Sequence, residues 1–237
     1  MKDMTKGPAA KLILLFAIPL LFGNLLLQVY SMVDTMVVGR FVGYQALAAV
    51  GATVSVVQLL LGLALGISNG VSVVTAQYFG AKQEAGARKS VAMGMLLCAG
   101  ASVVIGLAGM LCARPIYERM QTPGDIIDSA VLYTVIMFAG APATMLYNYV
   151  ASILRAFGDS KTPVVGLLIA SVINIALDLL FVVVFHWDVA GVGIATVISQ
   201  LVSGVLCGLY ALRKLPILKF QKGDFVWDSK MIAAQLK

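Results

Sequence analysis

Apolar residues in this chain come in long runs that are separated by short polar stretches. A helix needs about 20 predominantly apolar residues to cross the hydrocarbon core of a bilayer, and six runs reach that length. Glycine, proline and charged residues mark the breaks between them. The pattern predicts six helical spans near residues 12–38, 46–79, 90–112, 127–154, 163–185 and 190–212. The first two are longer than the minimum, so we expect them to tilt or project from the membrane.

The sequence changes character after Lys214. The tail "KFQKGDFVWDSKMIAAQLK" mixes polar and apolar residues, and Asp228 or Ser229 is placed to cap a short helix. Asp125, just after "TPG", is likewise expected to cap the fourth span. The pattern therefore divides the chain into a transmembrane unit, residues 1–214, and a cytoplasmic connector, residues 215–237.

Composition agrees with a membrane protein. Hydrophobic residues make up 60% of the 237 residues and charged residues only 12%, with a mean hydropathy of +0.96, whereas a soluble domain carries about 25% charged residues. The net charge of +6 does not indicate a nucleic-acid partner, because the basic residues lie in short loops beside apolar runs. The predicted partner is the lipid bilayer.

The basic residues are distributed unevenly between the two sides of the predicted bundle. Of the 17 Lys and Arg residues, three (Arg40, Arg114 and Arg119) fall on one side, and the rest fall on the side that holds both termini. Loops rich in Lys and Arg stay in the cytoplasm. We therefore expect a multi-pass protein of the cell (inner) membrane with both termini cytoplasmic.

Two acids, Asp34 and Asp178, lie within predicted spans, where a carboxylate is costly and is a functional candidate by default. Further polar residues recur at helical spacing around them. They form four stripes: Asn24, Gln28, Ser31 and Thr35; Ser171, Asn174 and Asp178; Thr196, Ser199, Gln200 and Ser203; and Thr144, Asn148 and Ser152, with Tyr133 on the same span. Each stripe alone is explained by hydrogen bonds between helices. Four stripes with two acids favour the lining of a wet cavity.

Oxygen-rich side chains with one or two carboxyls suit a hard cation or a proton and are poor ligands for soft metals, and no cofactor besides a coupling ion, Na+ or H+, is expected. Pro19 and Pro142 lie inside spans, where proline permits a kink; Pro19 shares its helix with Asp34, so a hinge and a static bend are both open there. Gly62, Gly66 and Gly70 repeat every four residues, as do Gly204 and Gly208, which predicts two close-packing faces.

Four segments together resemble the multidrug and toxic compound extrusion (MATE) transporters, specifically the DinF-like branch. They are "VDTMVVGRFVGYQALAAVG", "AQYFGAKQEAGARKSV", "YNYVASILRAFGDSKTP" and "NIALDLLFVVVFHWDVAGVGIATVISQ", and the resemblance covers roughly residues 10–230. It implies an all-α polytopic membrane bundle with six transmembrane helices that form the N-terminal lobe of a two-lobed transporter. A C-terminal six-helix lobe is then the expected partner, and the chain is interpreted as a fragment or as a half that needs one.

The resemblance also implies a site. Asp34, Asn174, Asp178 and Thr196 match the family's cation- or proton-coupling residues, and they would be the metal ligands if the coupling ion is Na+. Tyr133 and Asn148 align near that network, Gln28 and Asn24 are further candidates for lining the pocket, and Pro19 matches a proline at which the first span is proposed to bend.

The leading functional hypothesis is a secondary active antiporter that exports organic cations and other xenobiotics by alternating access, driven by H+ or Na+. The alternatives are a lipid-linked oligosaccharide flippase of related fold and a transport-inactive fragment. An enzyme is not expected: intramembrane aspartyl proteases carry "YD" and "GxGD" motifs, whereas Asp34 follows Val33 and Asp178 follows Leu177.

Overall fold

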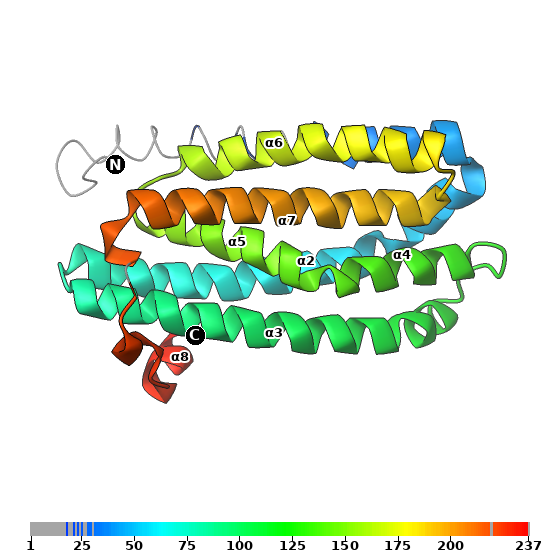
Figure 1. Ribbon diagram of the computed structural model, residues 1–237. Helices are drawn as coiled ribbons and strands as arrows, with labels where there is room; N and C mark the ends of the chain where they lie inside the picture. The colour runs from blue at the N-terminus through cyan, green and yellow to red at the C-terminus, as the bar shows by residue number, and fades with distance from the viewer. Residues whose placement is uncertain are drawn as a thin grey trace.

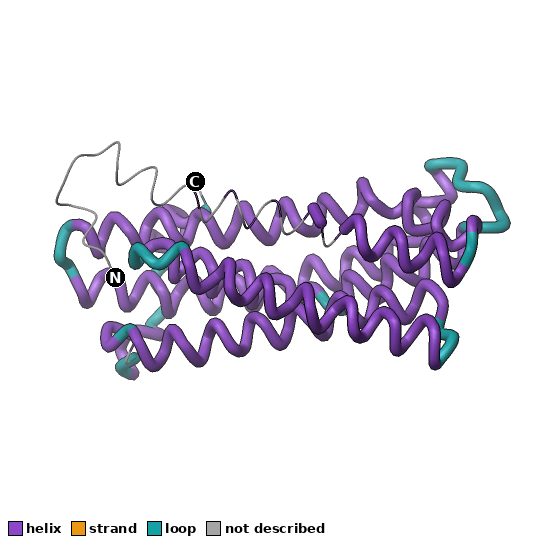
Figure 2. The backbone as a smooth tube through the Cα atoms, turned by 90° about the horizontal axis from the view of Figure 1, so that it is seen from above, coloured by secondary structure: helices purple, strands orange, loops and turns teal. Residues whose placement is uncertain are grey.

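The computed structural model describes residues 18, 21, 23, 25, 28, 29, 31–218 and 220–236, and in this part of the chain the regular elements are all helical (Figures 1 and 2). The α-helices run side by side in an elongated bundle. They are α2 (Tyr44–Gly80), α3 (Glu84–Arg119), α4 (Ile127–Ala139), α5 (Ala141–Ala156), α6 (Lys161–Asp178), α7 (Asp188–Lys214) and the short α8 (Ser229–Gln235).

The observed helices follow the predicted spans closely. Four of them are long and apolar enough to cross a membrane, and the α4–α5 pair makes a fifth span. Of the predicted first span the structure describes only part, including a helical stretch over residues 31–37. Helix α2 has 37 residues and α3 has 36, which gives each a length of about 55 Å. Because the hydrocarbon core is only about 30 Å thick, both helices must project from it or tilt strongly.

The fourth span is broken in the middle. Helices α4 and α5 meet at Gly140 with a bend of 48°, and Pro142 is the second residue of α5. Proline lacks the N–H that would continue the α4 ladder, and its ring clashes with the preceding turn, so a bend at this position is the expected result. Gly140 has no side chain at the elbow, where a Cβ atom would strike Val197 of α7.

Two local expectations about the third and fourth spans are wrong. Helix α3 continues through Pro115 to Arg119 instead of ending near residue 112, since a single missing backbone hydrogen bond is tolerated in a long helix whose neighbours hold it. Asp125 does not cap the fourth span. Helix α4 begins after Ile126, which makes no side-chain cap, and the backbone N–H groups of Ile126 and Ile127 donate to the Pro123 carbonyl instead.

Small residues set how closely the helices pack, and the spacing of glycines predicted some of these contacts, including the one at Gly204. A Cβ atom on Gly166 of α6 would strike Cys207 of α7, and one on Gly204 of α7 would lie 3.1 Å from the Tyr147 backbone nitrogen. Gly62 and Gly66 instead face open space in the described structure, so the predicted close-packing face on α2 is confirmed only at Gly70.

Two helices contain a π-helical stretch. Residues Val38–Val42 form η1, directly after the helical residues 31–37, and Leu179–Val184 form η2, directly after α6. Regions of this kind are rare and occur often at functional sites. Each follows, within a turn, one of the two membrane acids: Asp178 is the last residue of α6, and Asp34 lies four residues before η1.

The residues after α7 fold back onto the bundle. We call residues 221–236 the strap; it holds the 3₁₀ turn η4 (Lys222–Phe225) and α8, and it packs against α2 and α3 (Figure 1). Asp228 caps α8 by accepting from the N–H groups of Lys230 and Met231, which confirms one of the two expected caps. Gln235 is buried and donates to the Ser90 carbonyl and hydroxyl at 2.9 and 3.1 Å.

Two ion pairs fix the strap to the start of α3. Arg88 bonds Asp224 at 2.5 Å, and Lys89 bonds Asp228 at 2.7 Å. Burial acts to raise the pKa of Asp224, but the hydrogen bonds from Arg88 and the Gln221 backbone outweigh it and hold that pKa below 3.8. The hydrogen bond from Lys89 likewise lowers the pKa of Asp228. Because both pKa values are depressed on folding, the pairs stabilise the strap above about pH 4 and are lost as the pH falls further.

Gly70→Ala should release the strap, because the added Cβ atom would strike the backbone carbonyl of Gln235. We expect a loss of about 1–3 kcal/mol of stability and faster trypsin cleavage at Lys230 in detergent. Gly66→Ala, one turn away and facing open space, should be neutral or stabilising by up to about 1 kcal/mol. Equal cleavage rates in the two variants would contradict the docked strap.

Candidate ion-binding site

The predicted site residues come from four helices that meet in one half of the bundle. Asp34 lies in the helical residues 31–37, Asn174 and Asp178 on α6, Thr196 on α7 and Tyr133 on α4. Asp178 is 17 residues beyond the start of α6, which places it about 25 Å along that helix. Asp178 therefore lies far from the end of the bundle at which α6 begins and α7 ends (Figure 1).

Asn174 joins the two acids. Its side-chain nitrogen donates to Asp34 Oδ1 at 2.8 Å and to Asp178 Oδ2 at 3.1 Å, an orientation that follows from its neighbours, since both of these atoms are acceptors. The opposite end of the same amide faces Thr196, whose Oγ1 is 3.5 Å away. One side chain thus hydrogen-bonds the acids of the first helix and of α6 and lies against Thr196 of α7.

The two carboxyl groups lie close together, because the single Asn174 nitrogen is 2.8 Å from an oxygen of one and 3.1 Å from an oxygen of the other. Asp178 and Asn174 are completely buried. Asp178 Oδ1 has no hydrogen-bond partner among the described residues. Buried polar atoms are nearly always paired, so this oxygen is the atom of the network at which a proton or a cation can still bind.

Thr196 sits one helical turn along α7 from Val192, to whose carbonyl its hydroxyl donates at 3.0 Å. That bond orients Oγ1 towards Asn174. Tyr133 is buried beside the same group and interacts electrostatically with both Asp34 and Asp178. Its ring also packs against Gly193 of α7, where a Cβ atom would lie 3.4 Å from it.

Aliphatic side chains enclose the network. The buried cluster around it consists of Val37, Val38, Ala46, Tyr133, Met137, Val182, Val189 and Val192. An apolar wall lowers the local dielectric, which strengthens the hydrogen bonds inside it and raises the cost of any charge left unpaired. The arrangement is therefore sensitive to whether the acids carry protons.

The remaining predicted residues do not join this network in the described structure. Asn148 is half-buried and donates to the Thr144 carbonyl of its own helix at 2.8 Å. Gln28 is exposed. Asn24 and Pro19 lie outside the described residues, so the lining and hinge hypotheses for these two stay predictions.

A second polar group centres on Ser152, which belongs to the fourth predicted stripe, but the sequence reasoning missed its partners. Ser152 Oγ on α5 donates to Asn69 Oδ1 on α2 at 3.3 Å and accepts from Arg155 at 2.7 Å, and Ser72 donates to the Ser152 carbonyl at 2.9 Å. The available signal was Asn69 itself, an amide inside the apolar run of α2. These contacts tie α2 to α5 and lie apart from the two acids.

Asn174→Leu should destabilise the protein by about 1–3 kcal/mol, because it removes the shared donor and leaves two buried carboxyls facing each other. Ser171→Ala is the matched control on the same face of α6: its hydroxyl donates only to the Leu167 carbonyl, 3.0 Å away on its own helix, so the change should stay within about 0.5 kcal/mol. Thermal unfolding in detergent measures both. Equal melting temperatures would show that Asn174 does not bridge the acids.

Comparisons with known proteins agree with this architecture. The MatE family profile matches residues 19–180 of the chain. The probable multidrug resistance protein YpnP of Bacillus subtilis is 31% identical over 92% of this chain and 49% of its own length. DNA damage-inducible protein F of Escherichia coli is 28% identical over 89% of this chain and 46% of its own. The chain thus spans about half the length of these curated relatives.

Solved structures show the same relationship. An outward-facing multidrug resistance MATE family transporter of the MOP superfamily superposes with a TM-score of 0.90 at 25% identity, over 97% of this chain and 51% of that one. A MOP superfamily transporter from Pyrococcus furiosus gives 0.89 at 26% identity over the same shares. The described helices therefore form one lobe of a helical membrane bundle, and the chain belongs to the MatE family.

Proposed function

We propose that this chain provides one lobe of a secondary active transporter that exports drug-like organic cations, and that Asp34, Asn174 and Asp178 form its ion-coupling site. The observation that carries the proposal is the single buried amide that hydrogen-bonds two membrane acids from different helices. The names of the relatives support the substrate class, since they include multidrug resistance and multidrug export proteins.

Coulomb repulsion between adjacent carboxylates disfavours the doubly ionised state in a low dielectric. One proton shared by the Asp34–Asp178 pair removes that repulsion, and the Asn174 nitrogen then supplies a donor to each acid. Losing the proton leaves an uncompensated charge in an apolar enclosure. The two protonation states therefore differ in how strongly the first helix is held against α6.

The orientation of the Asn174 amide favours a proton as the coupling ion. Its nitrogen faces both acids, and a donor N–H in this position repels a cation placed between them. Carboxylate, hydroxyl and amide oxygens of Asp34, Asp178, Thr196 and Asn174 suit Na+ chemically. Na+ would bind there only after the amide reverses to present its oxygen.

The first helix is the element that such a change can move. Val33, Val37 and Val38 pack on the aliphatic cluster around the acids, so the contacts that position this helix are the same contacts that depend on the charge of the pair. An ion that binds one arrangement of a helix more tightly than another shifts the equilibrium between the arrangements. This differential affinity is what couples an ion gradient to alternating access.

The proposal includes the membrane orientation and a missing partner. Both termini lie on the cytoplasmic side of the cell membrane, as the distribution of Lys and Arg indicates. The other half of the transport pathway is supplied by a second six-helix lobe, in keeping with relatives about twice the length of this chain.

Asp178→Asn should abolish coupled export while leaving the protein folded. Asparagine keeps the size of the side chain but cannot carry the exchanged proton, and removing a buried charge is neutral or stabilising. The assay is ethidium efflux from proteoliposomes that contain the full gene product, with an imposed proton gradient in sodium-free buffer. We expect at least a tenfold loss, and Asp128→Asn, an exposed acid at a helix start, should be unaffected.

Wild-type efflux by Asp178→Asn would assign Asp178 a structural role. Efflux that needs Na+ but no proton gradient would show that the coupling ion at this site is Na+ and not a proton. A melting curve of each variant separates loss of coupling from loss of the fold.

Single cysteines should report the orientation. On a background without Cys98, Cys112 and Cys207, a cysteine at position 159, in the loop before α6, should react with a membrane-impermeant maleimide only in opened cells. A cysteine at position 125, before α4, should react in intact cells. The reverse pattern would invert the proposed topology.

A further inference from the structure

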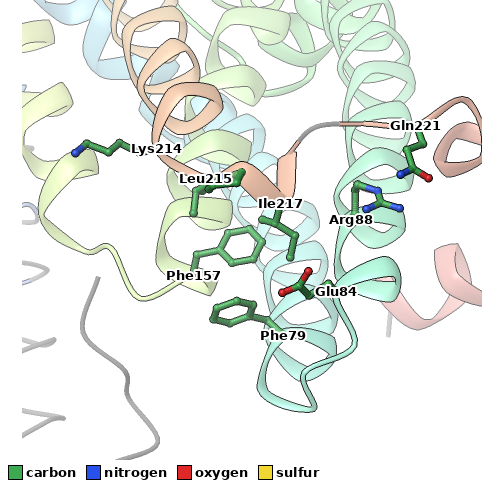
Figure 3. A pocket seen from close by; sticks show the side chains of 9 residues that line it. Phe79, Glu84, Arg88, Phe157, Lys214, Leu215, Ile217 and Gln221 are labelled. Carbon is green, nitrogen blue, oxygen red and sulfur yellow. The ribbon is translucent and has the colours of Figure 1, made fainter.

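A pocket of about 440 Å³ opens at the end of the bundle remote from the two acids. It lies where α2 and α5 end, α3 begins and α7 passes into the connector, and it is lined by Phe79, Glu84, Arg88, Phe157, Lys214, Leu215, Pro216, Ile217 and Gln221 (Figure 3). Its volume falls within the range of sites that hold drug-sized molecules, about 300–1,000 Å³.

The walls of this pocket are aromatic and aliphatic. Phe79 and Phe157 meet edge to face with their ring centroids 4.9 Å apart, and Leu215, Pro216 and Ile217 of the connector form the opposite side. Phe157 is buried and fixed by packing, whereas Phe79 is 43% exposed and offers ring surface to an incoming molecule.

One acidic side chain lines the pocket. Figure 3 shows the Glu84 carboxylate between the two rings and Ile217. It forms no ion pair within the part of the chain that the structure describes; the pairs there involve Arg88, Lys89 and Arg114 with other acids.

The two basic residues of the pocket contribute little net positive charge inside it. Arg88 is neutralised by Asp224 at 2.5 Å. Lys214 is exposed, and its side chain points away from the rings (Figure 3). An anion beside the rings would meet the Glu84 carboxylate while the Lys214 ammonium is directed away from them, whereas a cation there finds a carboxylate and aromatic surface together, the combination that recognises organic cations.

We propose that this pocket binds lipophilic organic cations at a site separate from the Asp34–Asp178 pair, with Glu84 as the charge partner and Phe79 and Phe157 as the aromatic wall. Its role as a loading site for export rests on the proposed function; the binding itself does not. The connector forms one wall, so the ion pair between Arg88 and Asp224 holds the pocket in shape.

Tetraphenylphosphonium and tetraphenylborate test the proposal, since the two ions match in size and shape and differ in the sign of their charge. Binding is measured by isothermal titration to the full chain in nanodiscs, with Asp178→Asn as the background so that the ion site does not contribute. We expect the phosphonium to bind more tightly than the borate. Glu84→Gln should lower the affinity for the phosphonium by about fivefold, which corresponds to the loss of one partly exposed ion pair.

Glu118→Gln is the matched control, the same change at the other end of α3, where the glutamate pairs with Arg114; it should leave binding unchanged. A cysteine at position 217 on a Cys112→Ser background localises the effect. Tetraphenylphosphonium should slow its reaction with maleimide when Glu84 is present and not in Glu84→Gln.

Three results would overturn the proposed cation site. They are no protection at position 217, equal phosphonium affinity with and without Glu84→Gln, or a Glu84-dependent binding of the borate that is tighter than that of the phosphonium. Failure of the export proposal looks different. In that case Asp178→Asn retains efflux. The protection at position 217 does not depend on efflux, so it still tests the pocket separately.

Discussion

Hydrocarbon supplies no water to satisfy a buried polar group, and that constraint governs the arrangement of this lobe. At the Asn174 amide, one side chain satisfies this constraint for several buried polar groups at once. That side chain donates to two acids and lies against a threonine of α7, so it joins the first helix to α6 at the point where both meet α7. The aliphatic cluster around it only packs correctly when those helices are in register.

Helical periodicity predicted the spans and the faces that meet, because membrane thickness and the 3.6-residue repeat leave little freedom. The convergence of Asp34, Asn174 and Thr196 followed from a family resemblance and not from spacing. Backbone detail was harder to predict: Pro142 bends its span and Pro115 does not, and the difference depends on neighbouring helices. Gly66 and Gly70 have the same spacing, yet only Gly70 meets the strap, a contact made by residues far away in sequence.

The two ends of the lobe have different chemistry. Around Asp178, the polar groups are buried beside a cluster rich in valine. At the other end, aromatic rings and an exposed carboxylate line a pocket large enough for an organic molecule. The strap contributes to the aromatic pocket and not to the network around Asp178, because Asp224 of the strap holds Arg88 beside the pocket. Disturbing either end should therefore leave the other intact.

The π-helical turns η1 and η2 have a geometric consequence of their own. A π turn holds about one residue more than an α turn, so its presence offsets everything beyond it by one residue in register. Converting such a turn to α geometry rotates the following residues by about 100° and displaces them by about 1.5 Å. Because η1 and η2 contact each other and each lies within a turn of a carboxyl, a conversion of one π turn would change the packing of the other beside the two acids.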